Sequence, residues 1–175
     1  RLTLSRVAGV CSISHMDSRM NDVTLEDDAT LADLLLAPPY FDALVTDCDA
    51  LVESEVHRKG MTVRTAVSMV KKIKPSIVDR TVRELMPDFL AELEPCHAEF
   101  KAAEGASFAD YLAARDERVA EAVLQVADRR AESIGSRPIR SAYARVRGRA
   151  LTEIRAVVPQ LARIIDRHRS RAIAG

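Results

Sequence analysis

Two stretches of this sequence nearly repeat each other, and no other feature constrains the fold as much. TLADLLLAP at residues 30–38 returns as SFADYLAAR at 107–115. Further stretches of the first half find counterparts in the second half in the same order: 63–71 with 139–147, and 82–93 with 154–165. Matches that keep their order at nearly constant spacing indicate an internal duplication. We therefore expect two tandem units of about 70–77 residues.

The composition favours helices in both units. Hydrophobic residues make up 47% of the chain and charged residues 30%, which suits a globular core and is too apolar for disorder. Alanine, leucine and arginine, which favour helices, are abundant, and six glycines and seven prolines leave little material for hairpin turns. The predicted fold class is all-α.

Capping residues and prolines place the individual helices. Thr30 and Ser107 are natural N-caps for a short first helix in each unit, with Asp33 and Asp110 in its first turn. Further helices are expected at 39–58, 62–73, 116–133 and 138–171, and Pro159 is expected to bend the last of these. Another helix is expected to begin after Ser76 as its N-cap, and Pro87 and Pro95 are expected to kink or divide it.

The first helix of each unit is too short to be stable alone, so we expect both units to share one core. Residues 28–105 form the first predicted repeat and residues 106–175 the second. The alternative architecture is a short α-solenoid of αα-hairpins, which the regular prolines also fit. Residues 1–27 are expected to be a leader that is flexible or not native.

Several segments resemble an uncharacterised bacterial family of small all-helical proteins. The segments are TLADLLLAPPYFDALV, VKKIKPSIVDRTVRELMPDFLAELEP and SFADYLAARDERVAEAVL, and the resemblance covers about residues 30–170. It implies an all-helical fold. It implies no activity and transfers no site residue, because no activity is established for that family.

Charge is divided unevenly along a chain whose overall charge is zero. Residues 17–55 hold eleven acids and one arginine, whereas residues 129–175 hold twelve arginines and three acids. The candidate acidic face comprises Asp42, Asp49 and Glu53. On a helical wheel of the last predicted helix, four arginines lie opposite the apolar side: Arg145, Arg149, Arg163 and Arg167.

Opposite charge on two faces predicts attraction between them, within one chain or between chains. We therefore predict a non-catalytic protein-interaction or regulatory module that self-associates, for example as a homodimer, or binds another protein. Nucleic-acid binding through the arginine-rich C-terminal helix is the alternative. It is the weaker one, because Tyr143 points to the core and leaves no aromatic platform for stacking bases.

A metal-dependent enzyme is a distant third prediction. Glu53 and His57 lie one helical turn apart and could share a metal ion, but no third ligand is evident. Cys96 and His97 are adjacent, so on a helix they point about 100° apart and do not form a thiolate–imidazole pair. No glycine-rich phosphate loop is present, and we predict no catalytic residue, metal or cofactor.

Two further residues are assigned to the helix expected at 39–58. Cys48 lies on its apolar face and is expected to be a buried hydrophobe. Glu55 projects near the same face, and we expect it to swing into solvent rather than pair with Arg140 or Arg147.

The cysteine pattern bears on the compartment. The chain has three cysteines and no C-x-x-C pair, which argues against a disulfide framework. No apolar run approaches the roughly 18 residues needed to span a bilayer. The expected location is therefore the cytoplasm, without membrane contact.

Overall fold

The computed structural model describes residues 29–58, 68, 77–103, 107–133 and 135–175, and every regular element in these ranges is an α-helix. The helices are α2 (Leu31–Leu35), α3 (Tyr40–Arg58), α5 (Ile77–Ala102), α6 (Phe108–Ala113), α7 (Asp116–Ser133), α8 (Arg137–Arg155) and α9 (Val158–Ala174). The all-α prediction is confirmed. The expected leader at 1–27 and nearly all of the expected helix at 62–73 lie outside the described residues.

Each of the two short helices, α2 and α6, begins with a hydroxyl side chain that caps the backbone N–H of an aspartate in its first turn. The Asp33 N–H donates to the Thr30 hydroxyl (3.1 Å), and the Thr30 N–H donates back to the Asp33 carboxylate (3.1 Å). In α6 the Asp110 N–H donates to the Ser107 hydroxyl (3.0 Å), which in turn donates to the Asp110 carboxylate (2.8 Å). The predicted N-caps are therefore confirmed. The hydrogen bond from the Thr30 side chain also lowers the pKa of Asp33.

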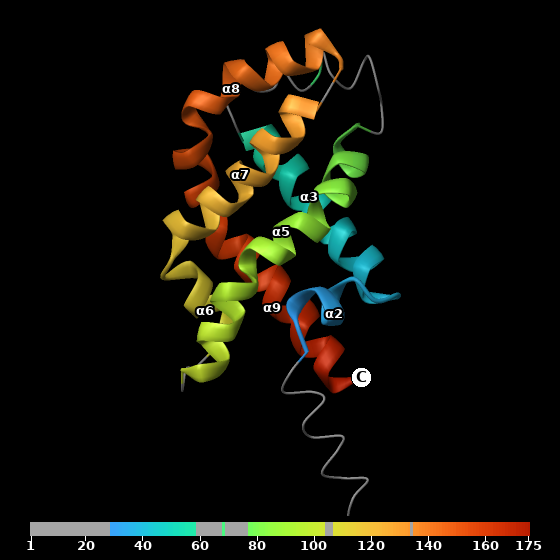
Figure 1. Ribbon diagram of the computed structural model, residues 1–175, viewed down its shortest axis with the longest axis vertical. Coiled ribbons are helices and arrows are strands. Elements are labelled where there is room, and N and C mark those ends of the chain that lie inside the picture. Colours follow the sequence, from blue (N-terminus) through green and yellow to red (C-terminus); the bar gives the residue numbers. More distant parts are fainter. Residues whose placement is uncertain (1–28, 59–67, 69–76, 104–106, 134) are drawn as a thin grey trace, which may run out of the picture.

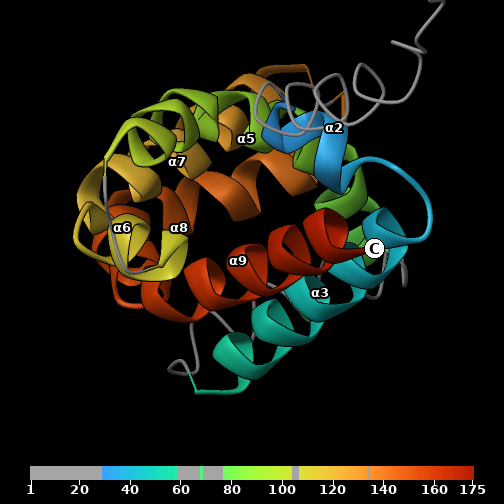
Figure 2. The same ribbon diagram turned by 90° about the horizontal axis from the view of Figure 1, so that it is seen from below.

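The long helices α5 and α9 organise the bundle (Figure 1), since α2, α3, α6 and α7 each pack against both of them. α8 packs on α7 and α9. Figure 2 shows α3 and α9 side by side, although they come from opposite ends of the described chain. In a solenoid each repeat contacts only its neighbours, so this pairing speaks against the solenoid alternative. The internal duplication itself stays a prediction.

One cluster of buried side chains joins residues from both halves of the chain. Many of its members are fully buried. Those on α2, α5, α6 and α9 include Leu31, Leu35, Leu90, Leu93, Phe108, Leu112 and Ile165. The short helices thus contribute to the shared core, which is how elements of five or six residues are stabilised.

The prolines lie at different places in the helices. Pro87 and Pro95 lie inside α5, which runs unbroken from Ile77 to Ala102, so of the two expected effects, a kink or a division, the division does not occur. The single long helix expected at 138–171 is wrong, because the chain breaks after Arg155 and restarts at Val158. Pro159 then lies in the first turn of α9, where a missing N–H removes no helical hydrogen bond.

Because of this break, the four arginines of the predicted basic face lie on two helices. Arg145 and Arg149 belong to α8, whereas Arg163 and Arg167 belong to α9. In Figure 1, α8 lies at one end of the molecule and α9 leads to the C-terminus at the other end. The basic segment is therefore not one continuous stripe.

Candidate functional site

Acidic side chains of α3 are paired within the chain. The Asp47 carboxylate accepts hydrogen bonds from Arg167 (2.7 Å) and from Nε2 of His168 (2.6 Å), both on α9. The hydrogen bond from His168 is the main reason that the pKa of Asp47 lies below its usual value. Asp42 pairs with Arg83 of α5 at 2.7 Å. Through these pairs α3 contacts α9 and α5 within one chain.

The residues of the candidate acidic face differ in their surroundings. Asp42 is exposed and ion-paired, Asp49 is half-buried, and Glu53 is exposed. The side chain of Glu55 is only 12% exposed and pairs with Arg58 on the same helix at 2.7 Å. The expectation that Glu55 swings into solvent is therefore wrong, because a partner one turn away holds its charge against the helix.

Many arginines of the basic segment also pair within the chain. These pairs hold α7 to α5 and α8 to α7: Arg129 with Glu92 (2.8 Å), Arg130 with Glu84, Arg147 with Asp128 (2.7 Å), and Arg155 with Asp116 (3.2 Å). Asp128 also accepts a hydrogen bond from the Tyr143 hydroxyl at 2.5 Å. These residues are committed to the fold and are not free to bind a partner.

Four arginines of α8 are exposed and form no ion pair with any described residue: Arg137, Arg140, Arg145 and Arg149. We call these four residues the α8 arginine surface. The helix that carries them has no buried residue and only one acid, Glu153. Two residues of the predicted basic face, Arg145 and Arg149, belong to this surface. On α9, Arg163 is exposed, and Arg167 forms an ion pair with Asp47.

The two candidate metal ligands, Glu53 and His57, lie on α3. Nδ1 of the exposed His57 lies 2.7 Å from the backbone carbonyl oxygen of Glu53 and donates its proton there. In the part of the chain that the structure describes, no three histidine, cysteine, aspartate or glutamate side chains gather as a metal site would require. Glu53 and His57 thus form a local helical contact.

The two described cysteines are buried. Cys48 lines the core, where burial raises the pKa of its thiol to about 12, as expected for a residue that acts as a small hydrophobe. Burial also raises the pKa of Cys96. Both thiols are therefore protonated at neutral pH and weak as nucleophiles. Cys11 lies outside the described residues.

A hydrogen-bonded chain through a buried histidine joins three helices. Nδ1 of His97 lies 3.2 Å from a carboxylate oxygen of Glu94, and the other oxygen of Glu94 accepts the N–H of Leu31 at 2.7 Å. Nε2 of His97 accepts a hydrogen bond from Nε of Arg169 at 3.1 Å. This pattern fixes a neutral imidazole with its proton on Nδ1. Sequence reasoning missed the network, because Arg169 and Leu31 are far from His97 along the chain.

We expect His97 to make the protein less stable as the pH falls below about 6.5, the ordinary histidine value. Burial lowers the pKa of folded His97, so below that pH the unfolded chain binds a proton that the folded chain does not. The stability that the neutral His97 provides is fully present above the pKa of this histidine in the unfolded chain. It is lost as the pH falls towards the lower pKa of His97 in the folded chain. Urea unfolding at pH 7.5 and pH 5 should show this loss, and His97→Gln should reduce it. A variant that loses as much stability as the wild type over this range would contradict the assignment.

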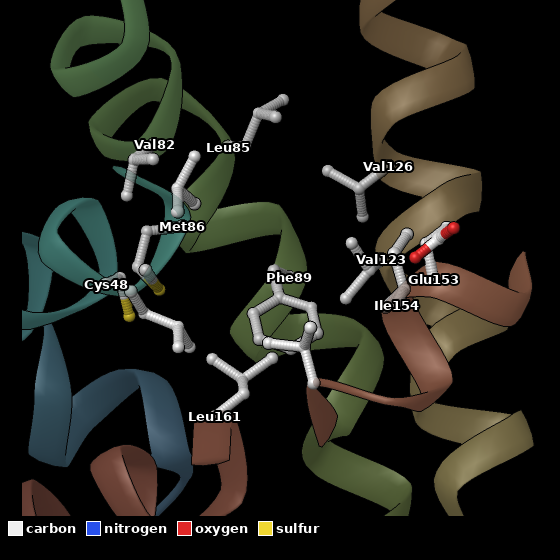
Figure 3. Close-up of a pocket in the computed structure, with 13 residues that line it drawn as sticks. Cys48, Val82, Leu85, Met86, Phe89, Val123, Val126, Glu153, Ile154 and Leu161 are labelled. Carbon is white, nitrogen blue, oxygen red and sulfur yellow. The ribbon is translucent and has the colours of Figure 1, made fainter. Parts of the chain in front are cut away.

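An apolar cavity of about 270 Å³ lies where α3, α5, α7, α8 and α9 meet (Figure 3). Its lining is almost wholly hydrophobic: Cys48, Leu51, Val52, Val82, Leu85, Met86, Phe89, Val123, Val126, Glu153, Ile154, Val157 and Leu161. Three of these residues, Ile154, Val157 and Leu161, lie within the range 138–171 that was expected to form the last helix. The cavity was not predicted, since it depends on how five helices meet.

No helix in the described ranges is long and apolar enough to cross a bilayer. Residues 31–169 match the family described as "Family of unknown function (DUF6918)", and the chain belongs to this family. The resemblance to an uncharacterised helical family is thereby confirmed. No curated protein and no solved structure matches the chain.

Proposed function

We propose that this protein is a non-catalytic helical interaction module and that copies of it associate through the α8 arginine surface. The observation that carries the proposal is the contrast between two sets of arginines. Those that face other helices are paired within the chain, whereas the four on the outside of α8 have no described partner. A cluster of exposed like charges repels itself and favours an acidic partner surface.

The chain itself carries the complementary charge. It has 26 lysines and arginines and 26 aspartates and glutamates, so a positive surplus on one surface is balanced by a negative surplus elsewhere. Four exposed acids of α5 and α7 form no ion pair with another described residue: Asp79, Asp88, Glu121 and Glu132. A second copy therefore offers carboxylates to the arginines of the first. This supports self-association over an unrelated partner.

Nucleic acid is the second candidate, since its phosphates would be attracted by the same arginines. One observation weighs against binding of single strands. Tyr143, the aromatic residue of α8, is half-buried and donates its hydroxyl to Asp128, so it is not available to stack on a base. A mobility shift that depends steeply on salt, with random duplex or single-stranded probes, would favour this candidate over self-association.

We expect the double substitution Arg145→Glu/Arg149→Glu to weaken self-association about tenfold or more, because each change replaces attraction by repulsion at the proposed contact. The measurement is the dissociation constant from sedimentation at low salt. The matched control is Arg163→Glu/Arg171→Glu, which makes the same change of net charge at two exposed arginines of α9. Equal weakening in both variants would show that net charge, and not the α8 arginine surface, sets the affinity.

A further inference from the structure

We propose that the cavity between α3, α5, α7, α8 and α9 binds a small uncharged apolar ligand of about ten carbon atoms. The inference is independent of the α8 arginine surface, since it rests on the volume, lining and chemistry of a cavity that is partly open to solvent. Figure 3 shows side chains from α3, α5 and α7 directed towards the same space, with Leu161 of α9 on another side.

The size of the cavity calls for an occupant. Interiors of folded proteins contain few voids larger than a water molecule, whose share of liquid volume is about 30 Å³. This cavity is about 270 Å³. A ligand that covers these apolar walls removes them from water and, because it binds only the folded chain, stabilises the fold. An apolar cavity of roughly 150 Å³ is enough to bind benzene, which suggests a ligand of about twice that size here.

The depth of the walls indicates a pocket rather than a shallow surface groove. Cys48, Met86 and Phe89 are 5%, 4% and 6% exposed, and Val126 is 2% exposed. Val52 is 37% exposed and marks the side on which the cavity approaches the surface. The part of a ligand that lies on the deep walls would lose its contact with water, which favours an apolar compound.

The chemistry of the walls selects against charge. Glu153 is the one charged residue among the thirteen that line the space. A charged group on the ligand, such as a carboxylate, would lose its hydration against these walls without gaining a partner there. Polar groups deep in the ligand would lose their hydrogen bonds to water without finding partners on the hydrophobic walls. The class that fits is therefore an uncharged hydrocarbon-like compound, such as a bicyclic aromatic or a terpene-like molecule.

Naphthalene is a suitable probe, because the protein contains no tryptophan whose fluorescence would overlap with that of the ligand. Titration of the full chain should give saturable binding of naphthalene and raise the unfolding temperature. 2-Naphthoate, of similar shape but negatively charged, should bind at least about tenfold more weakly. Absence of saturable naphthalene binding would overturn the proposal, and equal binding of 2-naphthoate would overturn the assignment of an uncharged ligand.

A substitution that fills the cavity locates the site. Val126→Phe adds a ring to the wall and should weaken naphthalene binding about tenfold or more, with helical circular dichroism unchanged. The matched control is Ile173→Phe, which enlarges an exposed side chain that does not line the cavity and should bind naphthalene as the wild type does. Val123→Phe, on the same wall, replaces Val126→Phe if that variant does not fold. A folded filling variant that binds like the control would contradict the location.

Discussion

Phe108→Ala should lower the free energy of unfolding by about 3–5 kcal/mol, the range for truncating a buried phenylalanine. The side chain is fully buried and belongs to the core cluster. Its ring lies 5.1 Å from that of Phe100 and 5.4 Å from that of His97, and the guanidinium of Arg169 lies 5.5 Å from its centre. The substitution therefore removes contacts to α5 and α9 at once.

Because single domains are stable by only about 5–15 kcal/mol, this variant should lie near the limit of folding. The measurement is urea unfolding followed by circular dichroism. Val52→Ala is the control, since Val52 is 37% exposed and its truncation should cost less than about 1 kcal/mol. A loss below about 1.5 kcal/mol for Phe108→Ala would contradict the position of α6 in the core.

Asp47→Ala should lower the free energy of unfolding by about 2 kcal/mol, because it leaves a buried donor without its acceptor. The side chain of His168 is 2% exposed, and its Nε2 hydrogen bond goes to Asp47. The same carboxylate also binds Arg167. Removing this carboxylate breaks the hydrogen bonds and the ion pair that join α3 to α9.

The matched control is Asp42→Ala on the same helix. Asp42 and its partner Arg83 have side chains that are 71% and 43% exposed, and a surface pair of this kind contributes less than about 1 kcal/mol. Equal losses in the two variants would contradict a special role for the Asp47–His168 contact. Since the pKa of folded Asp47 is lowered, its stabilising effect is present above the unfolded pKa and fades as the pH falls through the folded one. The difference between wild type and Asp47→Ala should therefore shrink in strong acid.

Local chemistry could be read from the sequence, and contacts between distant segments could not. The caps at Thr30 and Ser107 and the bounds of α7 follow from neighbouring residues, and the structure has them as expected. The role of each proline is not a local property. Pro87 lies inside a helix, whereas Pro159 lies in the first turn of one. At either position the chain could continue as a helix or start a new one, and packing against other helices decides which occurs.

The candidate site was predictable only in part for the same reason. An excess of arginine near the C-terminus is visible in the sequence, but which arginines remain exposed depends on partners elsewhere in the chain. Arg167 was assigned to the basic face and instead binds Asp47, whereas Arg137 was not assigned and is exposed. His57 is exposed and His97 is buried, and His97 continues the helical spacing of the buried Leu90 and Leu93 on the core side of α5.

In the proposed assembly, copies of this protein associate through charge on the α8 arginine surface. The most direct measurement of this association is sedimentation of the wild-type chain at about 0.02 M and about 0.5 M salt, concentrations at which charges are weakly and strongly screened. Wild-type chains should associate at low salt and be monomers at high salt. A monomer at both concentrations, or an assembly that salt does not affect, would contradict the proposed assembly.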